Sequence, residues 1–135
     1  MNSPSKQPEP PGFFLDRSLG KIRIATALRQ AGAIAHIHDD YFPPNAKDED
    51  WLTQVGQNGW IVLTKDHRIR YRNLEREALM NAGVGAFILT AGDMQGDEMA
   101  EIFVKALSAI AKFLQKHKKP FIARVARDGS VSLLF

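Results

Sequence analysis

The chain has 135 residues, of which 44% are hydrophobic, and 18 Lys and Arg residues stand against 15 Asp and Glu residues. This length predicts one domain, and the absence of cysteine excludes a disulfide scaffold, a thiolate zinc site and a cysteine nucleophile. No apolar run approaches the roughly 20 residues of a membrane helix, and the polar start lacks a signal-peptide core. We therefore expect a cytoplasmic protein with no membrane partner.

The N-terminal segment differs in composition from the rest of the chain. Residues 1–11 contain four of the seven prolines and almost nothing apolar, so we expect a disordered tail, followed by a single domain over residues 12–135. Phe13–Leu15 predicts a short buried strand. Ser18 is a favoured N-cap, and apolar residues at helical spacing then predict a helix that ends at Gly32.

Strands and helices continue to alternate through the middle of the chain. Ile34–His38 predicts a second strand, and a loop follows. Asp48 begins a second helix, whose acidic first turn suits the helix dipole and which ends at Asn58–Gly59. Trp60–Leu63 is strongly apolar and predicts a strand buried on both faces of the sheet.

The second half repeats this alternation and ends differently. Asn73 is expected to cap a third helix that stops at Gly83, and Val84–Leu89 predicts a fourth strand. Asp97 is expected to cap a long amphipathic helix that runs to Lys119, where Pro120 prevents continuation. Asp-Gly at 128–129, between alternating runs at 121–127 and 130–135, predicts a terminal β-hairpin.

This order of elements predicts an α/β fold. Strands that alternate with helices imply a three-layer α/β/α arrangement with a mostly parallel central sheet, and the C-terminal hairpin adds an antiparallel edge. The apolar terminal strand at residues 130–135 could also form an edge contact in a homodimer.

Acidic residues stand at three points of this pattern. Asp16 and Asp66 each follow a short apolar strand, and the cluster Asp48, Glu49 and Asp50 opens a helix. Strand ends meet at one edge of a parallel sheet, and carboxylates gathered there repel one another unless a cation or shared proton neutralises them. Carboxylate oxygens select Mg²⁺ or Mn²⁺ over zinc. Aspartate also commonly caps helices. A capping role alone would account for the position of Asp48 most easily and for that of Asp66 least easily.

These acidic segments resemble a known family. Phe13–Leu19, Asp48–Leu52 and Val62–Asp66 resemble, in this order, the three signatures of PIN domains, and the resemblance extends from about Phe13 to Thr90. Within that superfamily the chain is similar to the small PIN-like proteins related to VapC toxins of bacterial toxin–antitoxin systems. The resemblance implies a PIN-like fold and a Mg²⁺- or Mn²⁺-dependent endoribonuclease that cleaves RNA phosphodiesters with metal-activated water. It also implies a cognate antitoxin as a partner.

The resemblance implies specific metal ligands. Asp16 and Asp66 would bind the metal together with one carboxylate of the acidic helix start. In the family this carboxylate usually precedes an apolar pair, which favours Asp50, and Asp48 is the close alternative. The expected catalytic residues are therefore Asp16, Asp48, Asp50 and Asp66.

One position departs from the family pattern. Many relatives have a further acid two residues after the Thr-x-Asp aspartate, where this chain has Arg68. The missing acid counts against a two-metal site, unless Asp39, Asp40 or Asp93 supplies a carboxylate from a neighbouring loop. Alternatively, Arg68 itself binds a phosphate of the substrate. The missing acid also leaves a second function open, namely a catalytically weakened PIN-like module that binds nucleic acid or protein.

Basic residues follow Asp66 closely. Lys65, Arg68, Arg70, Arg72 and Arg76 lie within twelve residues, a pattern that could form a track for a phosphate backbone beside the metal. They could instead form a solvated loop or neutralise the acids. We expect Arg17, Lys65, Arg68 and Arg70 to bind substrate.

Two other site types fit less well. His36, His38 and Asp39-Asp40 are similar to a zinc-hydrolase motif, but catalytic zinc needs three protein ligands, so two partly exposed strand-end histidines are expected instead. A response-regulator receiver would need its Asp, Thr and Lys on separate strands, whereas Thr64, Lys65 and Asp66 are contiguous.

Overall fold

The computed structural model describes residues 11–66, 72–90 and 94–135. The predictions for residues 1–10, Arg68, Arg70 and Asp93 lie outside these described residues. None of the described helices is long and apolar enough to cross a membrane.

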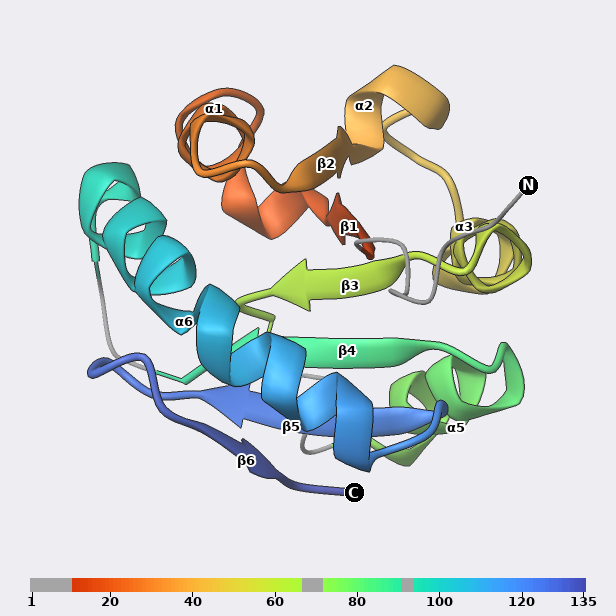
Figure 1. The fold of residues 1–135 in the computed structure, drawn as a ribbon. Coiled ribbons are helices and arrows are strands. Elements are labelled where there is room, and N and C mark those ends of the chain that lie inside the picture. Colours follow the sequence, from red (N-terminus) through yellow and green to blue (C-terminus); the bar gives the residue numbers. More distant parts are fainter. Residues whose placement is uncertain (1–10, 67–71, 91–93) are drawn as a thin grey trace, which may run out of the picture.

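Six strands form one sheet in the order β2-β1-β3-β4-β5-β6 (Figure 1). All neighbouring strands are parallel except β5 and β6, which are antiparallel. This arrangement confirms the predicted mostly parallel sheet with a terminal hairpin. The strands are β1 (Gly12–Leu15), β2 (Ile34–Ile37), β3 (Ile61–Thr64), β4 (Gly85–Leu89), β5 (Phe121–Val125) and β6 (Val131–Leu133).

Helices cover both faces of the sheet, because α6 crosses in front of it and α5 lies behind (Figure 1). One core cluster joins the sheet to α1 and α6, and the other joins it to α3 and α5. Phe13 and Leu15 face the first cluster and Phe14 faces the second, as strand alternation requires. The helices are α1 (Arg23–Gln30), α2 (His38–Tyr41), α3 (Asp48–Asn58), α5 (Asn73–Asn81) and α6 (Gly96–Lys116), with a 3₁₀ helix η1 (Arg17–Leu19).

The predicted helix start at Ser18 is wrong. Gly20 has a φ of 78°, which interrupts the helix, so the chain forms η1 first and α1 begins only at Arg23. Asp16 is the N-cap of η1, and its side chain accepts a hydrogen bond from the backbone N–H of Ser18. The side chain of Ser18 is therefore available for contacts at the end of β1.

The predicted starts and ends of other elements also differ. The structure has Arg72 and Gln95 as N-caps where Asn73 and Asp97 were expected, and α6 ends at Lys116. Glu98 accepts a hydrogen bond from the backbone N–H of Gln95 at 3.3 Å. Helix ends fray and hydrophobic spacing does not mark their last residues, so sequence patterns place them less well.

The short helix α2 was not predicted. His38 begins α2 and is only 3% exposed, so the expectation of a partly exposed strand-end histidine is wrong at this position. Its ring packs near Phe14, Phe42 and Trp51 at centroid distances of 5.5–5.9 Å. Aromatic packing thus holds α2 against the sheet and buries His38.

Candidate metal centre

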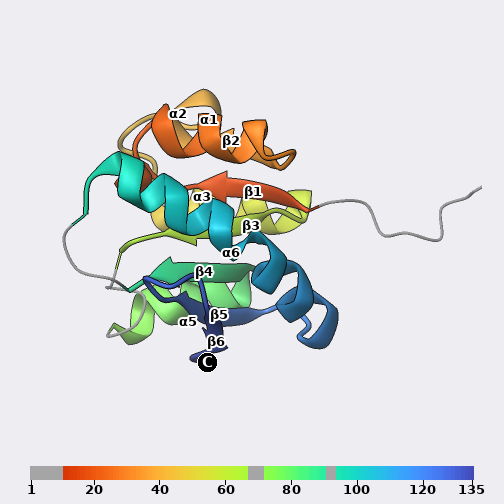
Figure 2. The same cartoon turned by 60° about the vertical axis from the view of Figure 1, so that its left-hand side comes forward.

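The first two predicted acids lie at the ends of neighbouring strands. β1 and β3 are parallel, with Leu15 opposite Leu63, and the backbone N–H of Asp16 donates to the carbonyl of Leu63 at 3.2 Å. Asp66 follows β3 after one residue, and its backbone N–H donates to Oγ1 of Thr64 at 2.9 Å. Figure 2 shows β1, β3 and β4 ending on the same side of the molecule. The topology therefore brings Asp16 and Asp66 to one edge, as the sequence predicted.

A cavity of about 250 Å³ opens at this edge. Four carboxylates line it, and they come from the end of β1, the start of α3, the segment after β3 and the first turn of α5. They are Asp16, Asp48, Asp66 and Glu75. The other lining residues are Arg17, Ser18, His38, Pro44, Ala46, Trp51 and Leu52.

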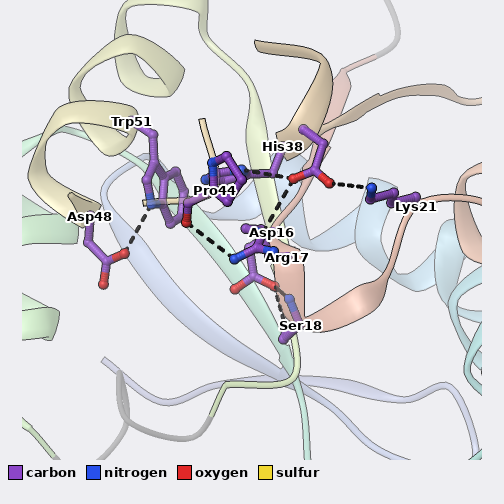
Figure 3. Close-up of polar contacts among 9 residues, drawn as sticks. Asp16, Arg17, Ser18, Lys21, His38, Pro44, Asp48 and Trp51 are labelled. Carbon is purple, nitrogen blue, oxygen red and sulfur yellow. Dashed lines mark hydrogen bonds and ion pairs between the residues drawn. The ribbon is translucent and has the colours of Figure 1, made fainter. Parts of the chain in front are cut away.

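Asp16 is the buried member of this set, with 8% of its surface exposed. Its carboxylate accepts hydrogen bonds from the backbone N–H of Ser18, at 3.0 Å, and from the Ser18 hydroxyl (Figure 3). It also accepts a hydrogen bond from the hydroxyl of Thr64. Within the described part of the chain no Lys, Arg or His forms an ion pair with it. Burial raises the pKa of Asp16 to about 6, the hydrogen bonds oppose this rise, and the negative charge of Asp66 adds to it.

Two hydroxyl groups hold Asp16 in place. Thr64 is fully buried at the end of β3, and its Oγ1 lies 3.3 Å from Oγ of Ser18. The same Ser18 oxygen accepts the backbone N–H of Lys65 at 3.2 Å. Sequence reasoning did not assign Ser18 or Thr64 to the site, although a threonine two residues before Asp66 was visible. The network links η1 to the end of β3 and fixes the direction of the Asp16 carboxylate.

The acidic start of α3 contributes Asp48 to the cavity. Asp48 is the first residue of α3, and its Oδ1 accepts a hydrogen bond from Nε1 of Trp51 at 3.0 Å (Figure 3). Asp50 is exposed and is not among the residues that line the cavity. The arrangement brings Asp48, rather than Asp50, together with Asp16 and Asp66.

Glu75 is the cavity acid that sequence reasoning missed. It lies in the first turn of α5, where its Oε1 is 3.8 Å from an Arg72 guanidinium nitrogen. In the sequence, Glu75 could have been noticed as an acid in the first turn of the helix that follows Thr64-Lys65-Asp66. Helical spacing alone does not show toward which neighbour a first-turn side chain points.

Asp39 and Asp40, the two described acids that were considered as substitutes, do not line the cavity. Asp39 pairs with Nζ of Lys21 at 3.0 Å and with Nε of Arg17 at 3.3 Å, and the hydrogen bond from Lys21 lowers its pKa. Asp40 is exposed and does not line the cavity. Among the acids of the described residues, Glu75 therefore takes the place at the cavity for which Asp39 and Asp40 were considered.

Basic residues also border the acids. Arg17 lines the cavity, donates to the carbonyl of Pro44 at 3.2 Å and keeps about half of its side chain exposed. The side chain of Lys65 is exposed one residue before Asp66. Arg72 is engaged with Glu75. Arg17 and Lys65 are thus the described members of the predicted substrate-binding set.

The donor chemistry of the cavity suits a hard cation. Its four acids provide oxygen ligands, and a buried carboxylate with a raised pKa, which no described cation neutralises, gains stability from a bound metal ion. Among the described residues, however, no three His, Asp or Glu side chains are already close enough to hold an ion together. Mg²⁺ often keeps several waters and uses one or two carboxylates, so a loose set of this kind still fits.

Comparisons with known proteins agree with these observations. Residues 11–91 match the family model described as "PIN like domain". A Mycobacterium tuberculosis protein named "Putative ribonuclease VapC45" is 30% identical over 126 residues, which span 90% of this chain and 91% of that protein. No solved structure gives a significant match.

Proposed function

The chain belongs to the PIN-like domain family, and from this premise we propose that it is a Mg²⁺- or Mn²⁺-dependent endoribonuclease of the VapC type. The observation that carries the proposal is Asp16, a buried carboxylate without a described cationic partner, which lines a cavity with three further acids. A stable fold tolerates such a group more easily when a cation is bound there.

We assign metal binding to Asp16 and Asp66, with Asp48 in place of Asp50 because Asp48 lines the cavity. Glu75 is proposed as a fourth acid that binds the metal directly or through water. A bound divalent cation would polarise an RNA phosphodiester and lower the pKa of the attacking water. Ser18 and Thr64 keep the Asp16 carboxylate directed so that it can take part.

The basic residues are proposed to bind the RNA backbone. Arg17 and Lys65 stand beside the cavity and are exposed enough to reach a phosphate. Arg68 and Arg70, which lie outside the described residues, remain predicted members of the same set. The relationship to a VapC protein also supports an antitoxin as a partner, and a homodimer through the β6 edge remains a prediction.

A cleavage assay tests this function directly. Purified wild-type protein is expected to cut single-stranded RNA with Mg²⁺ or Mn²⁺ and to lose this activity in EDTA. The Asp16→Asn and Asp66→Asn variants should be at least about 100-fold slower, because each loses a charged ligand. Asp40→Asn is the control, since Asp40 is exposed and does not line the cavity. Cleavage by both site variants at the wild-type rate would refute the proposal.

The second candidate is a PIN-like module that binds RNA or protein without cutting. The lack of a ready-made group of three ligands among the described residues favours it. Calorimetric titration with Mn²⁺ separates the two candidates. Carboxylate-dependent binding would support the nuclease, whereas no binding up to millimolar Mn²⁺ would support the module.

A further inference from the structure

A second and larger cavity lies at the amino ends of the strands, whereas the acids lie at their carboxyl ends. This groove has a volume of about 1070 Å³ and is bordered by the first residues of β1, β2 and β3 and by the last turns of α6. None of its lining residues also lines the acidic cavity. A ligand bound in the groove would therefore not occupy the proposed metal centre.

Part of the groove surface is aliphatic. Ile34, at the start of edge strand β2, is 45% exposed, which is high for a large apolar side chain. Leu114 of α6 is half-buried and also lines the groove, whereas Ile61 of β3 is 1% exposed and adds little surface. Ile34 and Leu114 can therefore bury aliphatic side chains of a bound molecule, which is favourable.

The charged residues of the groove all have one sign. Lys118 and Lys119 line it, and no Asp or Glu is among its lining residues. Nζ of Lys119 donates to the carbonyl of Gly59 at 2.9 Å. This hydrogen bond joins the segment after α6 to the turn before β3. Lys118 is exposed and is free of any described ion pair. The groove therefore favours an anionic occupant.

The aromatic residues of the groove help to distinguish a peptide from RNA. The ring of Trp60 is stacked on His36, at a centroid distance of 3.9 Å, and on Phe14, at 5.8 Å, and Tyr41 lies T-shaped to it at 5.0 Å. The indole thus already contacts three rings of the protein. Unpaired bases bind by stacking on free aromatic faces, so this surface suits aliphatic side chains better than bases.

We propose that the groove binds an acidic peptide segment of a partner protein, in which Asp or Glu residues alternate with Leu, Ile or Val. The aliphatic residues of the segment would pack on Ile34 and Leu114, and its carboxylates would pair with Lys118. The first ten residues of this chain do not have this chemistry, because they carry one lysine, Lys6, and one acid, Glu9.

The test uses a random 12-residue peptide library displayed on phage and selected on the full-length protein. Enriched peptides should combine acidic and aliphatic residues. After synthesis with a fluorescent label, they should bind Lys118→Glu and Ile34→Glu at least tenfold more weakly than wild type, by fluorescence anisotropy. The control is Lys112→Glu, a charge reversal on α6 at a position that does not line the groove. Circular dichroism verifies that each variant is folded.

Any one of four results would overturn the proposal. The library could yield no enriched peptides or only neutral or basic ones, or the enriched peptides could bind all variants equally. The affinity for a labelled 12-nucleotide RNA could be measured in Asp16→Asn, which is expected not to cut it, and in the double variant Asp16→Asn/Lys118→Glu. Tenfold weaker binding by the double variant would show that the groove binds RNA. Lys118→Glu or Ile34→Glu could change the mass in solution, which would make a second copy the occupant. Lys118→Glu is expected to cleave RNA at the wild-type rate. A wrong prediction about the groove can therefore be told apart from a wrong prediction about nuclease activity.

Discussion

Asp16 shows how a buried carboxylate can oppose stability. It is buried, it lacks a described cationic partner, and its pKa is raised from 3.8 to about 6. The folded protein therefore binds this proton more tightly than the unfolded chain does. Without metal, the charge of Asp16 costs stability, and the cost is fully present above pH 6 and disappears as the pH falls toward 4.

We therefore expect Asp16→Asn to be more stable than wild type when metal is removed. At pH 7.5 in EDTA its free energy of unfolding should be higher by about 1–3 kcal/mol, because the buried charge is gone and the amide can still pair with the two hydroxyls. Urea denaturation at pH 7.5 and pH 4.5 measures this. The gain should shrink at the lower pH, and an Asp16→Asn variant that is less stable than wild type at pH 7.5 would contradict the argument.

The two candidate acids of α3 give a matched pair of variants. Both acids are exposed, but Asp48 lines the cavity and Asp50, two residues later, does not. Asp48→Asn should reduce RNA cleavage by about 10-fold or more, whereas Asp50→Asn should stay within about twofold of wild type. Single-turnover cleavage rates compare them. The reverse order of effects would restore Asp50 as the ligand expected from the family resemblance.

At the scale of elements, the orientation of α5 determines which of its acids lines the acidic cavity. Its first turn places Glu75 at the cavity, while Glu77 of the same helix is exposed and does not line it. A helix turns about 100° per residue, so these two acids cannot face the same way. The direction of α5 thus decides which acid reaches the site.

We expect Glu75→Gln to weaken Mn²⁺ binding at least threefold, because one negative charge is removed from the cavity. Glu77→Gln removes the same charge from the same helix and should leave the affinity unchanged. Isothermal titration compares the two variants. Equal affinities of Glu75→Gln and wild type would show that Glu75 plays no part in metal binding.

The packing of α3 against α5 depends on Gly56. A Cβ atom at this position would lie 2.2 Å from the backbone carbonyl oxygen of Ala82, just after α5, and 3.4 Å from a methyl group of Val84. The backbone oxygen cannot rotate away, so the helices would have to move apart. Gly56 is thus a position where α3 lies directly against the segment that follows α5.

Gly56→Ala should therefore lower the free energy of unfolding by about 1–3 kcal/mol, despite the better helix propensity of alanine. Gln57→Ala, at an exposed position of α3, is the control and should change it by less than about 0.5 kcal/mol. Thermal and urea denaturation measure both. A Gly56→Ala variant as stable as wild type would show that α3 and α5 can separate at no cost.

The sequence predicted the sheet and the position of two acids well, for a physical reason. Alternation of buried strands with amphipathic helices leaves few topologies, and parallel strand ends then bring Asp16 and Asp66 together without further information. The roles of Ser18 and Thr64 and the position of Glu75 depend on side-chain directions, and the break at Gly20 depends on a local backbone angle. Hydrophobic spacing does not report these details.

In the whole molecule, the two edges of the sheet carry opposite chemistry. Acids line the cavity at the carboxyl ends of the strands, and lysines line the groove at the amino ends. We propose that the acids bind a divalent cation and that Asp16 is essential for this binding.

Calorimetric titration of Mn²⁺ into wild type and Asp16→Asn tests the claim most directly. Wild type should bind at pH 7.5 and about tenfold more weakly at pH 5, because protons compete for a carboxylate with a pKa of about 6. Asp16→Asn should show no such binding at either pH. Equal affinity of Asp16→Asn and wild type for Mn²⁺ at pH 7.5 would contradict the account.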